Sequence, residues 1–391
     1  MLGNHSTTTL LGLKGIEVNS VKETKYYLEI NISTPVKEHS CPCCKASTKR
    51  VHDYRNQRIK DLRIRGKPVI LILRKRRYVC KACGKKFYDK PAFLPKYHRM
   101  TQRVYESIID YMRSSYSMKS TAANFNVSTN TVSRVFDIVE YSLHRLPQVV
   151  SFDEFKGNAG GQKFQAILTN PQRKEVLDIL PTREQTYLID YIKGFSNRHN
   201  VRFAIMDMWG PYYEVAKAFF PNATIIIDKY HYVRQLYWAL DRVRKRVQQN
   251  FTKDRRIYFK RSKKLLFAKY DKLSDESKQA LAVMLNTNED LRSAWELKEM
   301  FNDFRKCVNS QDGRKVLSNW IMAAQDSRLS EFKDCTTAYS NWLNEICNSL
   351  DYPYTNGFTE GINNKIKVLK RNAYGFRNFK RFRNRILHCC A

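Results

Sequence analysis

The stretch from residue 149 to residue 227 places apolar runs, turns and helical segments in an order that few folds can accommodate. Three short apolar runs separated by turn residues come first, and two more runs follow, each preceded by a segment with helical periodicity. The five expected strands are 149–152, 164–169, 175–180, 201–206 and 223–227. Three hairpin-linked strands followed by two strands connected through helices predict a mixed sheet in an α/β fold.

Acidic residues end two of these runs at positions that the strand order brings together. The order is that of an RNase-H-like fold, in which the first and fourth strands are neighbours. Asp153 follows the first run and Asp207 follows the fourth, and adjacent strands lie about 4.8 Å apart. Carboxylates at that spacing can together hold two Mg²⁺ or Mn²⁺ ions, which prefer oxygen ligands. We expect Asp153 and Asp207 to share such a two-metal site, which Glu360 completes from across a cleft.

The charge of the chain indicates what such a site would act on. Lys and Arg number 70 and Asp and Glu number 37, so the formal net charge is +33. This balance favours a polyanionic partner held through many phosphate contacts. The content of 42% hydrophobic and 13% aromatic residues indicates a folded protein, of two to four domains at this length. Charge alone would also allow a ribosome-associated protein or a DNA-binding regulator, but together with the acids it predicts an enzyme that cuts DNA.

Other residues near the expected site have competing interpretations. Asp228 ends the fifth run and is a rival to Asp207 for the second metal position, although the strand order favours Asp207. His231 lies three residues later, where its imidazole could steady the scissile phosphate; an ordinary core or helix-surface histidine is the alternative. Glu154 should point to the opposite face, because side chains alternate along a strand, so a structural role is expected for it.

Cysteines in the N-terminal third have the spacing of a metal site. The segments 41–44 (CPCC) and 80–83 (CKAC) each contain a C-x-x-C knuckle, and two knuckles supply the four thiolates of a tetrahedral structural zinc site. The segment 69–79 between them is rich in β-forming residues, which suits a zinc ribbon whose knuckles cap hairpins. Its cations at 74–77 make the ribbon a DNA-contacting element as well. The expected ligands are Cys41, Cys44, Cys80 and Cys83, with Cys43 left open as a replacement ligand or a spare thiol.

Residues 117–135 have the rhythm of a helix-turn-helix motif. A turn is expected near Asn126, and the second helix begins with an N-cap at Ser128 or Thr129. An ordinary packed helical hairpin is the alternative. The residues that the second helix would present to base edges in a major groove are Asn130, Ser133 and Arg134.

The C-terminal part of the chain combines helices with further basic residues. The spacing of 132 positions from Asp228 to Glu360 exceeds what an RNase-H-like core needs, so residues 232–350 are expected to form a helical insertion. Its segment 241–264 carries a basic face that could clamp DNA or could simply be solvated. After Glu360, the residues that suit phosphates beside the active site are Lys365, Lys367, Lys370 and Arg371, interleaved with aromatic residues.

The order of these motifs resembles that of bacterial insertion-sequence transposases of the DDE type, the ISL3 group in particular. The resemblance runs from about residue 38 to the C-terminus and rests on FDEF at 152–155, MDMWGPY at 206–212, DKYH at 228–231 and, most specifically, the segment 355–387. It implies a Mg²⁺-dependent transposase that recognises terminal inverted repeats, nicks at the element's ends and joins the freed 3′ hydroxyls to target DNA. The family's triad then corresponds to Asp153, Asp207 and Glu360, and its D-x-x-H pair to Asp228 and His231.

These observations combine into one expected organisation. It comprises an N-terminal extension (1–37), a zinc ribbon (38–98), a helix-turn-helix domain (99–147), the first part of an RNase-H-like core (148–231), a helical insertion (232–350) and the completion of the core (351–391). The expected partners are double-stranded DNA, both transposon ends and target, and further copies of the chain in a synaptic complex. No apolar run is long enough to span a membrane, so a cytoplasmic, nucleoid-associated protein is expected. A structure-selective nuclease such as a resolvase, and a non-enzymatic regulator built on the zinc ribbon and helix-turn-helix, remain the alternatives.

Overall fold

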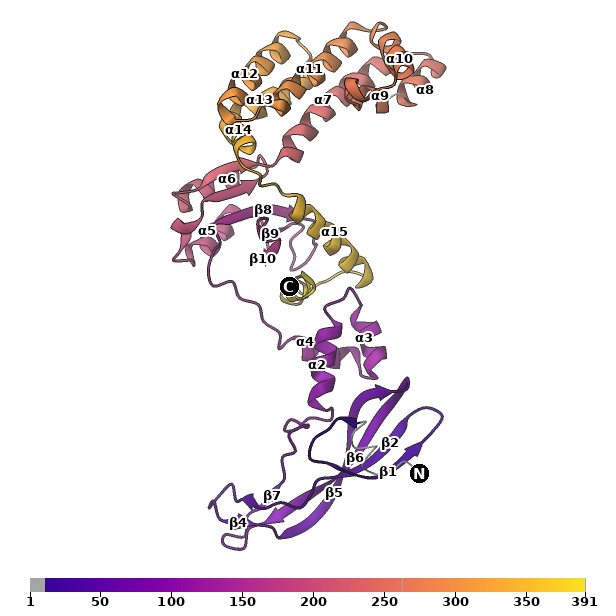
Figure 1. Ribbon diagram of the computed structural model, residues 1–391, viewed down its shortest axis with the longest axis vertical. Coiled ribbons are helices and arrows are strands. Elements are labelled where there is room, and N and C mark those ends of the chain that lie inside the picture. The colour runs from indigo at the N-terminus through magenta and orange to yellow at the C-terminus, as the bar shows by residue number, and fades with distance from the viewer. Residues whose placement is uncertain (1–10, 262, 391) are drawn as a thin grey trace. The chain divides into compact units, whose positions relative to one another are not determined.

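A computed structural model describes residues 11–261 and 263–390 of the chain. These residues fall into two compact units, one holding the chain up to Glu140 with Arg371–Tyr374, the other holding Tyr141–Lys370 and the residues from Gly375 onward. Figure 1 shows the elements of each unit. Among the described residues, no helix has the length and apolarity that a membrane span requires.

The N-terminal unit is built on one five-stranded sheet. Its strands are β1 (Glu17–Glu23), β2 (Leu28–Ser33), β5 (Val51–Ile64), β6 (Lys67–Val79) and β7 (Lys86–Tyr88), in the order β1-β2-β6-β5 with β7 on β6. A small hairpin of β3 (His39–Ser40) and β4 (Ser47–Thr48) precedes β5. The two cysteine knuckles form the turns between β3 and β4 and between β6 and β7, as the zinc-ribbon prediction requires.

The first two strands extend the ribbon across the boundary expected at residue 37. β2 pairs in parallel with β6, from Leu28 opposite Val69 to Ser33 opposite Arg74. Apolar side chains from both strands, including Ile32 and Leu71, enter one buried cluster. A parallel pair needs a long connection between its strands, so no local turn signal reveals this pairing in the sequence.

Three helices follow the sheet in the described part of this unit. They are α2 (Gln102–Tyr111), α3 (Met118–Phe125) and α4 (Thr129–Phe136). Asn126 adopts a left-handed conformation with φ of 53° at the turn, and the Ser128 hydroxyl accepts the Thr131 N–H as the N-cap of α4. The predicted helix-turn-helix motif is therefore present, with Ser128 as the cap.

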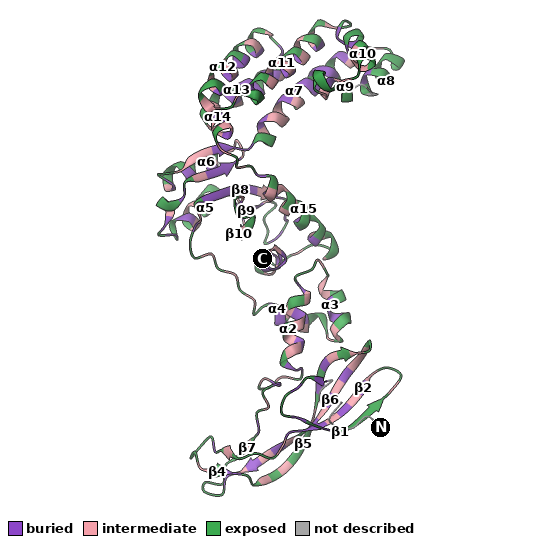
Figure 2. Ribbon diagram, in the orientation of Figure 1, coloured by how far each residue is buried: buried purple, intermediate pink, exposed green. Residues whose placement is uncertain are grey.

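The second unit contains a mixed sheet in the predicted order. Its strands are β8 (Val149–Phe155), β9 (Gln165–Asn170), β10 (Glu175–Leu180), β11 (Phe203–Met206) and β12 (Thr224–Ile227), arranged β10-β9-β8-β11-β12. β9 is antiparallel to both β8 and β10, whereas β11 is parallel to β8 and β12. Figure 2 shows the central strand β8 mostly buried, and Glu154 is its one half-buried residue. The α/β fold with first and fourth strands adjacent is thus confirmed.

Helices cover both faces of this sheet. Val150 and Phe152 of β8 pack with residues of α5 (Gln185–Lys193) and α6 (Gly210–Phe219) on one face. On the other face, Phe155 packs with residues of α15 (Gly357–Asn372) and α16 (Phe379–Cys390). Residues 149, 151, 153 and 155 therefore point toward the face that α15 covers.

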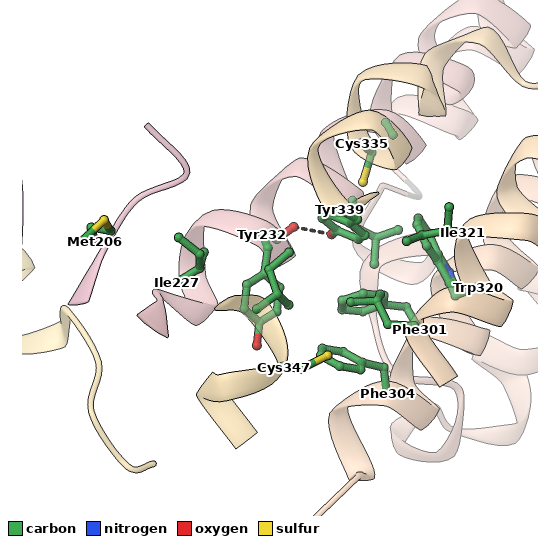
Figure 3. Close-up of a cluster of buried hydrophobic side chains, with 14 of the residues drawn as sticks. Met206, Ile227, Tyr232, Phe301, Phe304, Trp320, Ile321, Cys335, Tyr339 and Cys347 are labelled. Carbon is green, nitrogen blue, oxygen red and sulfur yellow. Dashed lines mark hydrogen bonds between the residues drawn. The ribbon is translucent and has the colours of Figure 1, made fainter. Parts of the chain in front are cut away.

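A helical insertion separates β12 from α15. It comprises α7 (Lys229–Gln249), α8 (Lys253–Arg261), α9 (Lys263–Phe267), α10 (Asp275–Leu285), α11 (Glu289–Lys306), α12 (Ser310–Asp326), α13 (Lys333–Asn341) and α14 (Leu343–Asp351). Figure 3 shows its aromatic core, in which Phe301, Trp320 and Tyr339 lie in mutual contact and Tyr339 donates a hydrogen bond to the Tyr232 carbonyl. The same buried cluster includes Ile227 of β12, so the insertion shares its core with the sheet.

Candidate active site and zinc centre

Two carboxylates lie where the central strands of the second unit's sheet separate. β8 and β11 pair only as far as Ser151 opposite Ile205. Asp153 lies two residues beyond that pair, and Asp207 directly follows β11. The sequence predicts that Asp153 ends its strand, but β8 continues to Phe155 because β9 still pairs with it on the other side. Both carboxylates therefore lie near the point where the pairing of these two strands ends.

Glu154 belongs to the same group of carboxylates, contrary to the expectation from strand alternation. Ligand atoms of Asp153, Glu154 and Asp207 all lie within 4.8 Å of one another. Glu154 also accepts a hydrogen bond from Arg183 at 2.8 Å. Alternation fixes the direction of Cβ but not of a carboxylate three bonds away, and beyond Ser151 no strand on the β11 side separates the two faces.

A second group of ligand atoms adjoins the first. Asp228 directly precedes α7, His231 lies in its first turn and Glu360 lies in the first turn of α15, and their ligand atoms are within 4.8 Å of one another. His231 Nδ1 lies 2.8 Å from Asp207 Oδ2, so the imidazole joins the two groups. The expected triad is therefore divided: Asp153 and Asp207 share one group, and Glu360 lies in the other with the D-x-x-H pair.

Asn356, fully buried just before α15, anchors the helix that carries Glu360. Its side-chain oxygen accepts a hydrogen bond from Ser151 of β8. Its backbone N–H donates to Asp228 Oδ1 at 2.9 Å. The start of α15 is thereby tied to both β8 and the end of β12.

Two further contacts extend this anchoring along α15. The hydroxyl oxygens of Thr359 and Thr169 lie 2.7 Å apart, and both residues are fully buried. One turn later, Asn363 Nδ2 donates to Asp153 Oδ2 at 2.9 Å. The helix therefore restrains the Asp153 carboxylate directly as well as positioning Glu360.

Burial and mutual repulsion shift the pKa values of this site. Desolvation, followed by the charge of Asp207, raises the pKa of Asp153 to about 7. Desolvation and then the charge of Asp228 raise the pKa of Glu360. Burial alone would lower the pKa of His231, but its hydrogen bond to Asp207 and the charge of that carboxylate outweigh burial and raise it. The acids are thus held close enough to disfavour their simultaneous ionisation unless cations are present.

The oxygen atoms of the site fit divalent cations. Glu154 Oε2, Asp207 Oδ1 and Asn363 Oδ1 are buried, and none accepts a hydrogen bond from any residue that the structure describes. Buried acceptors without partners are costly, and hard cations such as Mg²⁺ bind such oxygens. The site therefore offers a donor set suited to Mg²⁺ or Mn²⁺.

Sequence reasoning missed three polar residues of this site. Asn363 lies three residues after Glu360, so helical spacing would have placed both on one face. Asn356 precedes the helix and carries no local signal of burial. Arg183, the partner of Glu154, lies against the rings of Phe164 and Trp209, and only the fold brings these residues together.

The four predicted zinc ligands are gathered in the N-terminal unit. Sγ atoms of Cys41 and Cys83 lie 3.6 Å apart, those of Cys44 and Cys80 lie 3.5 Å apart, and all four lie within 4.8 Å of one another. Tetrahedral zinc with Zn–S bonds of about 2.3 Å separates its sulfurs by about 3.8 Å, so the thiols fit this ion. Cys43 is exposed and lies outside the group.

Backbone hydrogen bonds lower the pKa of the first cysteine of each knuckle, which favours its thiolate form. Backbone N–H groups of Cys44 and Cys43 lower the pKa of Cys41 to about 6. The two knuckles also have the same type of turn. Lys45 N donates to the Cys41 carbonyl in the first, and Gly84 N donates to the Cys80 carbonyl in the second. Both turn residues have positive φ, 63° for Lys45 and 71° for Gly84, a conformation that suits glycine and strains lysine.

The predicted base-reading residues differ in exposure. Asn130 and Arg134 of α4 are exposed. Ser133 is half-buried, and its hydroxyl lies 3.2 Å from the Met118 sulfur of α3. Ser133 therefore contributes to the packing of α4 on α3, and Asn130 and Arg134 are the two available to a ligand.

The basic residues after Glu360 also divide into two kinds. The ammonium groups of Lys365 and Lys370 donate to backbone carbonyl oxygens. Lys367 is exposed and donates to Asn364 Oδ1 on its own helix, and Arg371 is exposed. Of the interleaved aromatic residues, Phe376, Phe379 and Phe382 pack in the core beneath the sheet. The spacing of these phenylalanines is that of the apolar face of α16 and of the segment that leads into it.

The basic face expected in the insertion is partly neutralised within the protein. Arg244 and Lys245 both make ion pairs with Asp241. Arg246 lies 2.6 Å from Glu331, which precedes α13. These cations stabilise the helical insertion itself, so the segment 241–264 offers less free positive charge than its sequence suggests.

Comparison with known proteins gives concordant matches along the chain. A family model described as a transposase matches residues 150–386, one described as the zinc-finger of transposase IS204/IS1001/IS1096/IS1165 matches residues 37–83, and one described as the helix-turn-helix domain of transposase family ISL3 matches residues 91–137.

Curated relatives agree with these models. The transposase for insertion sequence element IS1001 of Bordetella parapertussis is 26% identical over 98% of this chain and 97% of its own length. The transposase for insertion sequence element IS1557 of Mycobacterium tuberculosis is 27% identical over 36% of this chain and 32% of its own. A Lactococcus lactis subsp. lactis protein named as an ATP-dependent protease is 37% identical, but over only 23% of this chain and 28% of its own. Because the transposase model alone matches residues 150–386, more than half of the sequence, this chain belongs to the transposase family ISL3.

Proposed function

We propose that the protein binds the terminal inverted repeats of its insertion sequence and cleaves and joins DNA strands at a Mg²⁺- or Mn²⁺-dependent site formed by Asp153, Asp207 and Glu360. One observation carries the proposal: five carboxylates and an imidazole meet in two adjoining groups with unpaired buried oxygens, in a chain of net charge +33. An acidic site in a basic protein suits metal-assisted chemistry on a polyanion. Divalent ions would neutralise the carboxylates, and the basic residues of the chain would attract the phosphates of the substrate.

Each residue has a role that its surroundings suggest. Bound ions would supply activation of the attacking water or 3′ hydroxyl and stabilisation of the leaving oxygen. Asp153 and Asp207 would hold the ions from the sheet, and Glu360 from α15. Asn363 orients Asp153, and His231 orients Asp207 and would contact a bound phosphate.

Asp207 is a better candidate ligand than its rival Asp228. Both oxygens of Asp228 already accept backbone hydrogen bonds, from Asn356 at 2.9 Å and Tyr230 at 3.2 Å. Asp207 Oδ1 is buried and has no such partner among the described residues. We assign Asp228 to the capping of α7 and the anchoring of α15, and Asp207 to the metal.

The N-terminal part of the chain would recognise the DNA. Residues 38–147 would bind the inverted repeat, and residues 148–231 with 351–391 would carry the chemistry. Asn130 and Arg134 would read base edges, and Lys367 and Arg371 would contact phosphates near the cleaved bond. Synapsis of two ends would require at least two copies of the chain.

The proposal is tested with the purified full-length protein and a duplex that carries an end of the element. Asp207→Asn should abolish strand cleavage and strand transfer in Mg²⁺ and leave end binding nearly unchanged, because the substitution removes an ion ligand without touching the DNA-binding unit. Asp190→Asn, an exposed carboxylate on α5, is the matched control and should retain both activities. Equal activity of the Asp207 variant would defeat the assignment.

A strand-transfer assay with a pre-cleaved end of the element distinguishes a transposase from a resolvase and from a regulator. A transposase joins the pre-cleaved 3′ hydroxyl to a second duplex, whereas a resolvase cuts without joining. Binding without any cleavage, with or without divalent ions, would instead indicate a regulator.

A further inference from the structure

The end of strand β5 holds the helix-turn-helix motif through backbone and buried ionic contacts. Lys60 exchanges two backbone hydrogen bonds with the segment that leads into α2, accepting from Thr101 at 3.0 Å and donating to Arg99 at 2.9 Å. The neighbouring Asp61 side chain is fully buried and receives hydrogen bonds from the Thr101 hydroxyl and the Arg103 guanidinium. A buried ion pair with several hydrogen bonds resists displacement, because breaking it leaves an uncompensated charge.

Side chains from the same end of β5 also hold the turn before the recognition helix. Arg63 donates to the carbonyl oxygens of Ala123 and Asn124 at the end of α3, at 2.7 and 2.6 Å. Lys60 Nζ donates to the carbonyl of Asn126 in the turn itself. Cations at these carbonyls also complement the helix dipole. The position of α4 is therefore coupled to the strand that leads to the zinc knuckles.

The long hairpin of β5 and β6 sets the distance between α4 and the knuckles. The two strands pair from Asp61 opposite Val69 to Val51 opposite Tyr78, and the knuckles follow directly. Lys60 lies nine positions after Val51, which at about 3.3 Å per residue gives roughly 30 Å. One turn of B-DNA measures about 34 Å. The two ends of the hairpin are therefore separated by nearly one helical turn.

The knuckle end carries a dense and unopposed positive charge. The segments 41–50 and 80–86 contain no acidic residue. Their six cations are all exposed, and within the described chain none forms an ion pair; they are Lys45, Lys49, Arg50, Lys81, Lys85 and Lys86. Such a surface is complementary to phosphates.

We propose that the knuckle end is a second DNA-contacting surface, which binds phosphates of the same duplex about one helical turn from the base pairs that α4 reads. The spacing favours double-stranded DNA, because the same face of a duplex recurs at this interval. The inference rests on the proposed function, since it assumes that α4 binds the element's end. It adds that the zinc site has a recognition role, presenting a charged surface at a fixed distance from α4.

Hydroxyl-radical footprinting tests this inference. The zinc-loaded full-length protein is bound to a 40-base-pair duplex taken from one end of the element. Two protected patches about 10 base pairs apart are expected. The double variant Lys81→Ala/Lys85→Ala should keep the patch due to α4 and weaken the other. Its plot of log affinity against log salt should be shallower by about 1.8, from two phosphate contacts at about 0.9 each.

A matched double variant controls for the loss of charge. Lys22→Ala/Lys25→Ala removes two exposed lysines near the turn between β1 and β2, at the opposite end of the sheet, and should leave the second patch intact. Shortening the duplex by ten base pairs on the knuckle side should weaken binding of the normal protein and leave the Lys81/Lys85 variant little affected. Zinc content of one ion per chain verifies that each variant is folded.

The outcomes separate this inference from the proposed function. A single protected patch, or equal salt dependence of the two double variants, overturns the second surface while leaving α4 as the reader of the end. No protection by the normal protein would overturn the proposed function itself.

Discussion

The Asp153 carboxyl destabilises the metal-free catalytic unit, so Asp153→Asn should stabilise that unit. Desolvation and the charge of Asp207 raise the pKa of Asp153 to about 7 from an ordinary value of 3.8. Because the folded-state pKa lies above the unfolded value, the unfolded chain releases its proton first. The penalty is therefore absent below about pH 4, grows between about pH 4 and pH 7, and is fully present above pH 7.

The magnitude follows from the size of the shift. About three pKa units at about 1.4 kcal/mol each correspond to roughly 4 kcal/mol of lost stability at pH 8. At pH 5 the folded carboxyl is mostly protonated, and the penalty is only about 1.7 kcal/mol. Asp153 accepts two hydrogen bonds, from Asn363 and from the Glu154 backbone N–H. The Asn side chain can keep one of them, and the loss of the other costs about 1 kcal/mol at either pH. The gain from Asp153→Asn should therefore be about 2.5 kcal/mol larger at pH 8 than at pH 5.

The chain provides its own probe for this measurement. All five tryptophans lie in the unit that contains Asp153, so urea unfolding followed by tryptophan fluorescence reports on that unit alone. The experiment uses zinc-loaded protein in buffer free of Mg²⁺ and Mn²⁺, with Asp190→Asn as the exposed control. An equal gain at both pH values, or a net loss at pH 8, would refute the reasoning. Adding Mg²⁺ should reverse the ranking, since only the normal carboxylate gains an ion.

Three further predictions concern other parts of the molecule. Cys80→Ser should reduce bound zinc from one ion per chain to none, whereas Cys43→Ser should keep it, as elemental analysis would show; retention by the first variant would contradict the ligand assignment. Lys45→Gly should stabilise the first knuckle by about 0.5–1 kcal/mol by relieving its positive φ, measured as slower loss of zinc to a chelator, and faster loss would count against strain at this turn. Phe301→Ala, in the insertion core of Figure 3, should cost about 3–5 kcal/mol in urea unfolding, and a loss below 1 kcal/mol would mean that the core repacks.

Short-range patterns in the sequence predicted much of this fold. The cysteine knuckles, the turn before α4 and the strand order from residue 149 to residue 227 each depend on residues close in the chain. The convergence of Asp153 and Asp207 followed from that order, because β8 and β11 are neighbours in it. The pairing of β2 with β6 was not predictable in this way, since the two strands are joined by a long connection.

Side-chain assignments based on periodicity were less reliable. Alternation predicted Glu154 on the far face, yet its carboxylate reaches the site where the sheet opens. Ser133, expected at base edges from the helix-turn-helix motif, packs against α3. Lys365 and Lys370 were expected at phosphates because of their charge, and their ammonium groups donate to backbone carbonyl oxygens. Periodicity specifies the direction of Cβ, whereas a long side chain goes where a partner or an opening lies.

The sequence by itself determined that the chain holds a zinc ribbon, a helix-turn-helix motif and an α/β core with acids at adjoining strands, because spacing along a few residues dictates each of these geometries. Only the tertiary structure decided that Glu154 joins Asp153 and Asp207, and that Glu360 lies with the second group. Glu360 joins Asp228 and His231 because α15 is held by contacts such as Ser151 with Asn356, 205 residues apart in the chain. No local pattern encodes such a contact, since it exists only once the sheet and the helix have packed.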